Sequence, residues 1–427
     1  MNITVIGAGK MGLPLACYLA ARGAKVWATD VRRTVVDAIN SARSPIDEPG
    51  VQKLLEEVVP AGRLRATFDT GDAVRRSEVA IVIVPALLTP DRHADLSILD
   101  AVTAEVAGAL HEGLLVSYET TVPVGTTRQR FLPRLEQGSW RVGKNFYVAF
   151  SPERVKSGLV LERMGKTPKV VGGAEPESAR RAEEFYRTAL GVEVVNVGSL
   201  ENAEMVKLAG MIYRDVNIAL ANELARYAEA VGIDFSRLLA AANNDGEAHL
   251  LEPGFGVGGH CAPVYPYFVI HHARAIGVPV TCAENARAIN DGQAVHVVTR
   301  LEKALGSLEG RETLILGLGF RPQVKEHFCS PAFLLQTELQ RRGASVKLHD
   351  DLYTPDELWA FGFRAGGLNG DRVADIIILN TAHAAYKDLD FAALAARGLK
   401  AVVDGRNLWE PQEVRRHGLI YLGIGRP

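Results

Sequence analysis

A glycine-rich turn near the start of the chain constrains the fold more than any other feature. Residues 3–7 form a β-branched strand pattern, and Gly7-Ala8-Gly9-Lys10-Met11-Gly12 separates it from a helical pattern over residues 13–21. In that context a GxGxxG motif is typical of a dinucleotide site, where the backbone approaches the pyrophosphate and the helix N-terminus binds it. A second strand pattern, over residues 25–29, ends at Asp30, whose carboxylate is placed to accept the ribose hydroxyls of an adenosine.

We therefore expect the cofactor to be held by the turn and by the acidic residue that follows the second strand. The expected contacts are Gly7, Gly9, Lys10, Met11, Gly12 and Asp30. A carboxylate repels a 2′-phosphate, so Asp30 favours NAD over NADP, although Arg32 and Arg33 lie close in sequence and weaken this preference. The alternative is a tight turn of an α/β fold that binds no ligand.

Further strand patterns lead into polar loops. The apolar strand pattern 79–85 and the strand pattern 114–119 are typical of strands buried on both faces of a parallel sheet. The second of these runs into the hydroxyl-rich loop 120–127, which contains Thr121, and residues 147–150 run into the charged loop 151–158. Ligands bind at the carboxyl ends of strands in open α/β sheets, which favours substrate contact over simple solvation for the charged loop.

A long helical pattern occupies the middle of the chain. From about residue 201 to residue 231 there is no proline, Gly210 is the only glycine, and apolar residues recur with a helical period. A helix of this length usually bridges domains or forms a dimer seam, and we expect a homodimer. Lys207 lies near the apolar stripe, where a lysine is either a surface residue with a buried stem or a functional cation.

The last third repeats the nucleotide-fold pattern in a degenerate form. Residues 312–320 form a strand pattern that ends in a glycine turn without a third glycine, and residues 345–350, 375–380 and 400–407 form strand patterns with polar ends. We expect a second doubly wound domain that holds a nucleotide mainly by its phosphates, with Arg321 and Arg406 as the nearest cations. The alternative is that either arginine is an ordinary surface residue.

The stretch 253–263 is the densest in glycine and ends in a cysteine. It reads Pro-Gly-Phe-Gly-Val-Gly-Gly-His-Cys-Ala-Pro, with four glycines within six residues. Glycine is used where φ must be positive or where the backbone must approach a ligand. Cys261 is therefore either a nucleophile presented by a loop or an ordinary buried cysteine after a turn.

Composition excludes several classes of protein. A chain of 427 residues is too long for one core, and its 47% hydrophobic content and net charge of −2 show no nucleic-acid footprint. We find no signal-peptide pattern and no apolar run that would span a bilayer, so we expect a cytoplasmic protein with no membrane partner. The four cysteines are scattered without metal-ligand spacing, and no metal is expected.

Eight motifs, spread in order over nearly the whole chain, carry a resemblance to a known family. They are GAGKMGLP (7–14), TTVPVGTT (120–127), SPERV (151–155), ENAEMVKL (201–208), YRDVNIALANE (213–223), PGFGVGGHCAPV (253–264), GLGFRP (317–322) and DGRN (404–407). Together they resemble the nucleotide-sugar 6-dehydrogenases, which include UDP-glucose and UDP-N-acetylmannosamine dehydrogenases. SPERV, YRDVNIALANE and GVGGHC are more similar to the N-acetylhexosamine branch.

The resemblance implies two successive oxidations of a sugar CH₂OH by NAD, through an aldehyde. Cys261 would capture the aldehyde as a thiohemiacetal, which becomes a thioester that water hydrolyses. Lys207 would stabilise the developing oxyanion, and Thr121, also beside the cofactor, and Glu153 would serve proton transfer and water positioning. The implied contacts to a nucleotide-sugar substrate are Arg154, Lys156, Phe255, Gly258, His260, Phe320, Arg321 and Arg406.

Several positions depart from the pattern of the family, and they cluster at the chemistry. Met211 stands where the family has an asparagine that donates to the oxyanion, and Tyr265 stands where it has an aspartate. Phe328 and Cys329 replace an arginine and a glutamate. The loss of one oxyanion donor raises the barrier by roughly 3–4 kcal/mol.

These departures leave three functions open at the level of the sequence. The first is the four-electron oxidation of the family, with other groups replacing the missing ones. The second is a single NAD-dependent oxidation, or a redox-neutral epimerisation, of a related sugar substrate. The third is a catalytically silent protein that binds NAD or a nucleotide sugar.

The predicted fold class is α/β, with two Rossmann-like doubly wound domains joined by a central domain built on the long helix. The predicted bounds are 1–198 for the NAD-binding domain and 199–296 for the helical dimerisation domain. The C-terminal nucleotide-sugar domain is expected to cover residues 297–427.

Overall fold

The computed structural model describes residues 1–427, which pack into two compact units. The first unit comprises residues 1–210 and 267–278, and the second comprises residues 211–266 and 279–427. The predicted long helix is present as α9 (Leu200–Val231), which begins in the first unit and ends in the second. The three predicted domain bounds stay a prediction.

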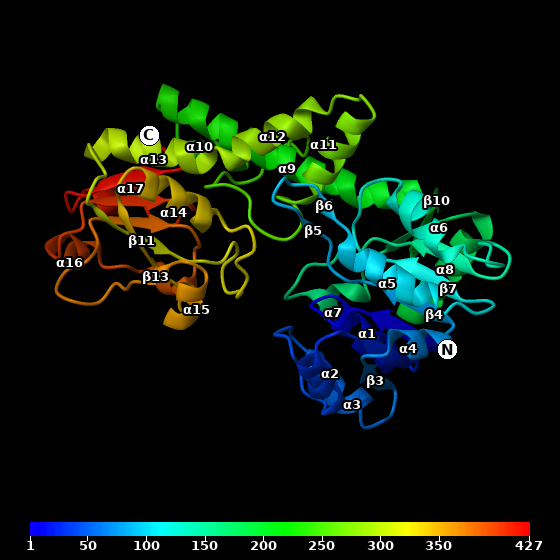
Figure 1. The fold of residues 1–427 in the computed structure, drawn as a ribbon. Coiled ribbons are helices and arrows are strands. Elements are labelled where there is room, and N and C mark those ends of the chain that lie inside the picture. The colour runs from blue at the N-terminus through cyan, green and yellow to red at the C-terminus, as the bar shows by residue number, and fades with distance from the viewer. The chain divides into compact units, whose positions relative to one another are not determined.

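The first unit is built on an eight-stranded sheet with the order β10-β9-β8-β7-β4-β1-β2-β3. Strands β3, β4, β7 and β10 of this sheet are labelled in Figure 1. All neighbouring strands are parallel except β8 and β9. The part β3-β2-β1-β4-β7-β8 has the strand order of a dinucleotide-binding fold, in which the ligand crevice opens where the order reverses, between β1 and β4. The strands are β1 (Asn2–Ile6), β2 (Lys25–Thr29), β3 (Leu64–Thr67), β4 (Val79–Val82), β7 (Leu115–Tyr118), β8 (Tyr147–Phe150), β9 (Lys169–Gly173) and β10 (Val194–Ser199).

Both faces of this sheet are buried, as its continuous apolar strands predict. In β4, Val79 and Ile81 belong to one apolar cluster and Ala80 and Val82 to another. The first cluster includes side chains of α1 (Gly12–Ala21), α3 (Val51–Val58) and α8 (Pro176–Leu190), and the second includes side chains of α5 (Ser97–Ala107) and α6 (Leu132–Leu135). Helices on both faces explain why the strands show no apolar–polar alternation.

The second unit contains a six-stranded sheet with the order β13-β12-β11-β14-β15-β16, in which every pair is parallel. This is the same strand order as in the first unit, so the prediction of two doubly wound folds is confirmed. The strands are β11 (Glu312–Leu316), β12 (Ser345–His349), β13 (Arg364–Ala365), β14 (Ile376–Leu379), β15 (Ala401–Asp404) and β16 (Ile420–Gly423).

Helices make up the rest of the second unit. The C-terminal part of α9 is accompanied by α10 (Phe235–Ala242), α12 (Thr281–Asp291), α13 (Gln293–Leu305) and α14 (Pro331–Arg341). None of the helices combines the length and the apolar character that crossing a bilayer requires. The cytoplasmic location stays a prediction.

Candidate active site

The glycine turn after β1 has the shape that a dinucleotide needs. Gly7 has a φ of +104°, and its N–H donates to the carbonyl of Thr29 at 2.9 Å. A Cβ at Gly12 would lie 1.8 Å from the carbonyl oxygen of Gly7, so only glycine lets α1 begin so close to β1. At Gly9, by contrast, a Cβ would meet no atom within 4 Å, which leaves an open side where a pyrophosphate can approach the backbone. Lys10 is exposed at this turn and Met11 is partly buried.

Asp30 lies at the end of β2 and is held by an arginine. Arg32 donates to both oxygens of its carboxylate, at 3.0 and 3.2 Å. Burial opposes ionisation, but the hydrogen bonds from Arg32 lower the pKa of Asp30 below its ordinary value. Arg33 lies over the ring of Phe68, 5.1 Å from its centroid. Both arginines are thus engaged with side chains of the chain itself, which supports NAD rather than a 2′-phosphorylated cofactor.

The loop that contains Thr121 is fixed by a buried glutamate of α9. The carboxylate of Glu204 accepts the backbone N–H groups of Gly125 at 2.5 Å and of Thr127 at 2.9 Å. Burial raises the pKa of this carboxyl group. The loop after β7 that contains Thr121, which is 4% exposed, is therefore held by a side chain 79 positions away from Gly125 in the sequence.

Lys207 lies one helical turn after Glu204 on α9. Its side chain is buried, with 8% exposure, and its ammonium group has no hydrogen-bond or ion-pair partner in the chain. The ammonium at the end of this buried stem is not itself sealed from solvent. Because it has no partner in the chain, it is available to a polar ligand.

Glu153 is held by its own loop and by a buried lysine. Its carboxylate accepts the N–H groups of Arg154 at 2.6 Å and Val155 at 2.8 Å, and the ammonium of Lys169 at 3.1 Å. Lys169 also donates to Glu119 at 2.8 Å. The sequence predicted a role for Glu153, but neither Lys169 nor Glu119 was among the predicted site residues.

The rest of the charged loop is tied to distant backbone. The guanidinium of Arg154 donates to the carbonyl of Pro168, and Lys156 is exposed. Glu48, from the loop between α2 (Arg33–Asn40) and α3, accepts the N–H groups of Gly158 at 2.6 Å and Val160 at 2.8 Å. The loop that carries Glu153 is therefore anchored at both ends.

In the second unit, a buried amide network holds the glycine-rich stretch before Cys261. Asn222 of α9 accepts the N–H of Gly254 at 2.9 Å, and Gln293 donates to the carbonyl of Gly254 at 2.9 Å. Asn222 also donates to Asn290 at 2.9 Å. Because these three side chains are fully buried, they act as a rigid support for the stretch.

Behind this network lies a buried ion pair. Asp215 accepts from Asn290 at 2.9 Å and lies 3.2 Å from Arg287, whose guanidinium also donates to the carbonyl of Ala262 at 3.4 Å. Burial raises the pKa of Asp215 to about 6, although Arg287 opposes the shift. The YRDVNIALANE motif thus supplies both Asp215 and Asn222 to the support of the cysteine.

Cys261 is partly exposed and lies immediately before a helix. Its carbonyl accepts the N–H groups of Val264 at 3.1 Å and Tyr265 at 2.9 Å, so it caps the first residues of α11 (Tyr265–Ala275). All four cysteines are free thiols. A partly exposed thiol on a rigidly supported loop agrees better with a nucleophile than with a core cysteine.

Aromatic side chains pack on the same stretch. A Cβ at Gly258 would lie 2.3 Å from the Cβ of Phe320, so this contact requires glycine. His260 stacks on Phe328 with 4.3 Å between ring centroids. Phe328, which stands where the family pattern has an arginine, therefore has a defined contact. Phe255 is 1% exposed and packs on Gly405, so its ring supports the loop from within the core and offers no surface to a ligand.

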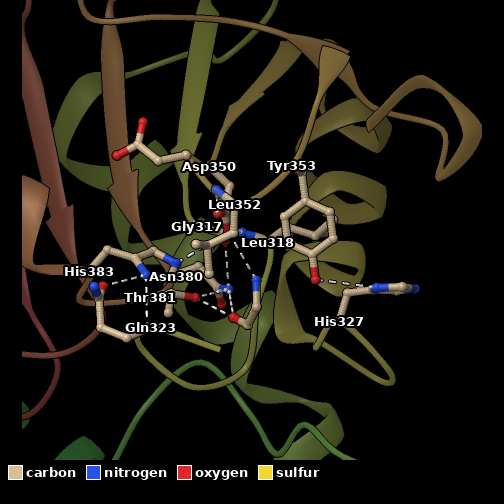
Figure 2. A network of polar contacts seen from close by, with 12 residues as sticks. Gly317, Leu318, Gln323, His327, Asp350, Leu352, Tyr353, Asn380, Thr381 and His383 are labelled. Atoms are coloured by element: carbon tan, nitrogen blue, oxygen red, sulfur yellow. Dashed lines mark hydrogen bonds and ion pairs between the residues drawn. The ribbon is translucent and has the colours of Figure 1, made fainter. Parts of the chain in front are cut away.

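The glycine turn of the second sheet is occupied by a carboxylate of the protein (Figure 2). Asp350, directly after β12, accepts the N–H groups of Leu318 at 2.7 Å and Gly319 at 3.3 Å, and His383 lies 3.3 Å from it. Burial opposes ionisation, but these contacts lower the pKa of Asp350. Asn380 donates to the carbonyl of Gly317 at 2.9 Å and closes the turn from the other side.

The two cations predicted to hold a nucleotide at this sheet lie near the turn and the glycine-rich stretch. The guanidinium of Arg406 donates to the carbonyl of Asn380 at 2.9 Å and lies against Gly254. Arg321 pairs with Glu326 at 3.2 Å and is about one-third exposed. Both predicted cations lie in the second unit, next to the glycine-rich stretch or to the turn that follows β11.

Comparisons with known proteins agree with this architecture. The chain matches the UDP-glucose/GDP-mannose dehydrogenase family: the NAD-binding domain over residues 1–190, the central domain over 201–292 and the UDP-binding domain over 314–411. It is 33% identical to the UDP-N-acetyl-D-mannosamine dehydrogenase of Pyrococcus horikoshii, over 100% of this chain and 99% of the relative. It is 31% identical to an NDP-N-acetyl-D-galactosaminuronic acid dehydrogenase of Ralstonia solanacearum, over 97% of each.

Solved structures show the same fold. The UDP-D-ManNAc dehydrogenase of P. horikoshii superposes with a TM-score of 0.88 at 31% identity, covering 100% of this chain and 99% of that one. A UDP-glucose dehydrogenase from Pyrobaculum islandicum gives a TM-score of 0.88 at 26% identity, covering 100% and 98%.

Fold, glycine turn and comparisons together define an NAD-dependent oxidoreductase with two doubly wound sheets. More particularly, the chain belongs to the UDP-glucose/GDP-mannose dehydrogenase family. The predicted family and the predicted NAD cofactor are thereby confirmed.

Proposed function

We propose that this protein oxidises the C6 alcohol of a UDP-sugar, of the UDP-N-acetylhexosamine or UDP-glucose type, to a carboxylate. The observation that carries the proposal is Lys207, whose side chain is largely buried, with 8% exposure, and whose ammonium has no partner in the chain. Such a group is stabilised by an oxygen that becomes negatively charged during the reaction. The names of the relatives and the UDP-binding domain support the substrate class.

Different residues serve proton transfer, stabilisation of the oxyanion and capture of the aldehyde. NAD, when bound, accepts a hydride from the carbon that is oxidised. Glu153, which lies with Thr121 beside the reacting carbon in this proposal, takes the proton of the alcohol, and Lys207 stabilises the oxygen as its charge grows. The thiolate of Cys261 then adds to the aldehyde carbon, and the thiohemiacetal becomes a thioester by losing its hydroxyl proton to Glu153, which has released the first proton to solvent, and a hydride to a second NAD.

Hydrolysis completes the reaction. Glu153, after it has released its proton to solvent again, takes a proton from a water that attacks the thioester; the C–S bond breaks, and the products are the carboxylate and the free thiol of Cys261. Nucleotide contacts are assigned to Arg321 and Arg406, and sugar contacts to Arg154 and Lys156. His260, Phe320 and the backbone at Gly258 and Phe255 complete the proposed substrate site.

The experiment that tests this function counts NADH formed per sugar consumed. Each of a panel of UDP-hexoses and UDP-N-acetylhexosamines is supplied in limiting amount with excess NAD, and the product is identified by mass spectrometry. Two NADH per sugar and a uronic acid product are expected. One NADH per sugar would instead show that oxidation stops at the carbonyl.

A second candidate function is favoured by one observation. Met211, one helical turn after Lys207, cannot donate the hydrogen bond that the family pattern places there. A single oxidation or a redox-neutral epimerisation would need less stabilisation of an oxyanion. NAD binding without any NADH release, with every sugar, would favour epimerisation or a silent binding protein, which product analysis separates.

We also propose that the protein is a homodimer through α9. In the second unit this helix exposes a stripe of large apolar side chains at heptad-like spacing, with exposures of 61% for Tyr213, 43% for Leu220, 65% for Tyr227 and 48% for Val231. An exposed apolar stripe on a long helix is typical of an interaction surface.

Leu220→Asp should therefore convert a dimer into a monomer, because it places a charge at the centre of the stripe. Size-exclusion chromatography with light scattering measures the mass of each species. Arg237→Ala, an exposed change on α10, serves as the control and should leave the mass unchanged. A wild-type protein that is monomeric at micromolar concentration would contradict the proposed dimer.

A further inference from the structure

Behind Glu153, four other side chains form a continuous polar chain into the core of the first unit. Lys169 bridges Glu153 at 3.1 Å and Glu119 at 2.8 Å. Tyr186 of α8 donates to the other oxygen of Glu119 at 2.6 Å, and the hydroxyl of Ser117, in β7, lies 2.8 Å from the hydroxyl of Tyr186. The chain therefore runs from a central strand of the sheet to the predicted catalytic carboxylate.

Exposure decides which member can reach a ligand. The side chain of Glu119 is 0% exposed and that of Lys169 is 8% exposed, whereas Glu153 retains 13%. Glu153 is thus the only carboxylate of the pair that opens to a small cavity, lined also by Pro152, Arg154, Val155, Met164, Thr167, Pro168, Lys169 and Leu190. Glu119 can act only through Lys169.

Among these polar side chains, negative charges outnumber positive ones. One ammonium faces two carboxylates, and the ring of Tyr186 lies 5.1 Å from the ammonium. Burial raises the pKa of Glu119, whereas at Glu153 the attraction of Lys169 and the backbone N–H groups overcome burial and lower the pKa. Arg154, the nearest other cation on the loop, directs its guanidinium to the carbonyl of Pro168.

We propose that Lys169 is a positioning residue that orients Glu153 and keeps it ionised for proton transfer, with Glu119 and Tyr186 fixing Lys169 from the core side. This inference rests on the proposed function for the reaction itself. When Glu153 accepts a proton, an O–H bond of the alcohol or of water breaks and one forms on the carboxylate. The cluster then changes from one net negative charge to none, while Lys169 stays paired with Glu119.

The alternative is that Lys169 merely joins β7 to β9. A purely structural ion pair would lower stability when it is removed, but it would not shift the pH dependence of the reaction. The two interpretations can be distinguished because Lys169 and Glu119 have opposite effects on the pKa of Glu153. The ammonium lowers this pKa, and the second carboxylate raises it.

The test is the pH profile of kcat for NADH formation in Lys169→Met, Lys169→Arg and Glu119→Gln. Lys169→Met removes the attraction that lowers the pKa of Glu153, so the acidic limb should move up by about one to three pH units. Lys169→Arg should restore the limb to its wild-type position. Glu119→Gln removes a like charge and keeps the fold, so the limb should move down.

The matched control is Lys166→Met. Lys166 is an exposed lysine three positions before Lys169, 3.8 Å from Glu162, and its replacement should leave the pH profile unchanged. Loss of rate in the three variants without displacement of the acidic limb would overturn the inference. So would displacement in the same direction by Lys169→Met and Glu119→Gln.

A second measurement does not depend on finding the substrate. In Lys169→Met the two buried carboxylates lack a counter-ion, so the melting temperature should fall further below wild type as pH rises from about 5 to about 8. Adding Glu153→Gln should narrow this difference. The protein could fail to oxidise any sugar while the difference in melting temperature still widens with pH and is narrowed by Glu153→Gln. In that case the proposed function fails, and the inference that Lys169 keeps Glu153 ionised stands. A difference that is constant with pH would overturn that assignment.

Discussion

Cys261→Ala should abolish formation of the carboxylate product while leaving NAD binding intact. The substitution removes the sulfur that captures the aldehyde but touches neither the glycine turn nor Asp30, which lie in the other unit. Loss of a nucleophile typically lowers kcat by several orders of magnitude, so we expect about 10³-fold or more. Calorimetric titration with NAD and mass spectrometry of the sugar product measure the two effects separately.

Cys282→Ala provides the matched control, because Cys282 is an exposed cysteine on α12 of the same unit. It should retain full acid production. Undiminished acid production by Cys261→Ala would remove the covalent mechanism and leave direct hydration of the aldehyde as the route. Accumulation of an aldehyde in this variant would instead place the cysteine at the second oxidation, as proposed.

Lys207→Met should lower kcat by roughly 10²–10³-fold, or about 3–4 kcal/mol in the barrier, without lowering stability. Methionine keeps the volume and the unbranched shape of the side chain. Since the ammonium has no partner in the chain, replacing it with an apolar group breaks no hydrogen bond or ion pair and should leave the melting temperature unchanged or higher.

This combination distinguishes a functional cation from a surface lysine. Thermal unfolding and steady-state kinetics on the same preparation provide both readings. The exposed Lys166→Met should change neither quantity by much. A Lys207→Met protein that is less stable yet fully active would show that Lys207 supports the fold and does not take part in the reaction.

Much of the fold could be predicted from local patterns. The glycine turn, the acidic residue after β2 and the apolar strands indicate a doubly wound sheet because each depends on residues close in sequence. The long helix 200–231 was predicted within a residue of its observed start, from an uninterrupted helical period. The second sheet could be predicted as well, since its strands carry the same apolar runs.

The buried residues that hold the loops of the site could not be predicted from local sequence patterns. Glu204 and Asn222 lie within two motifs of the resemblance, but their roles depend on partners 79 and 32 residues away. Lys169 begins a strand and Glu119 follows one, so neither position signals chemistry. Only the pairing of β7 and β9 with β8 brings these two charges together, and pairing between strands distant in sequence has no local signature.

The start of the helix after each glycine turn has a consequence for how one chain uses one fold twice. Asp30 and Asp350 each follow the second strand of their sheet and each accept a backbone N–H of the turn, so the carboxylates do not distinguish the two turns. In the first sheet α1 begins at Gly12, directly after the turn, whereas in the second α14 begins only at Pro331, so the second turn offers no helix N-terminus to a pyrophosphate. A repeated architecture thereby gains a division of labour, in which recognition in one half is assigned to loops and cations and the coenzyme is reserved for the other.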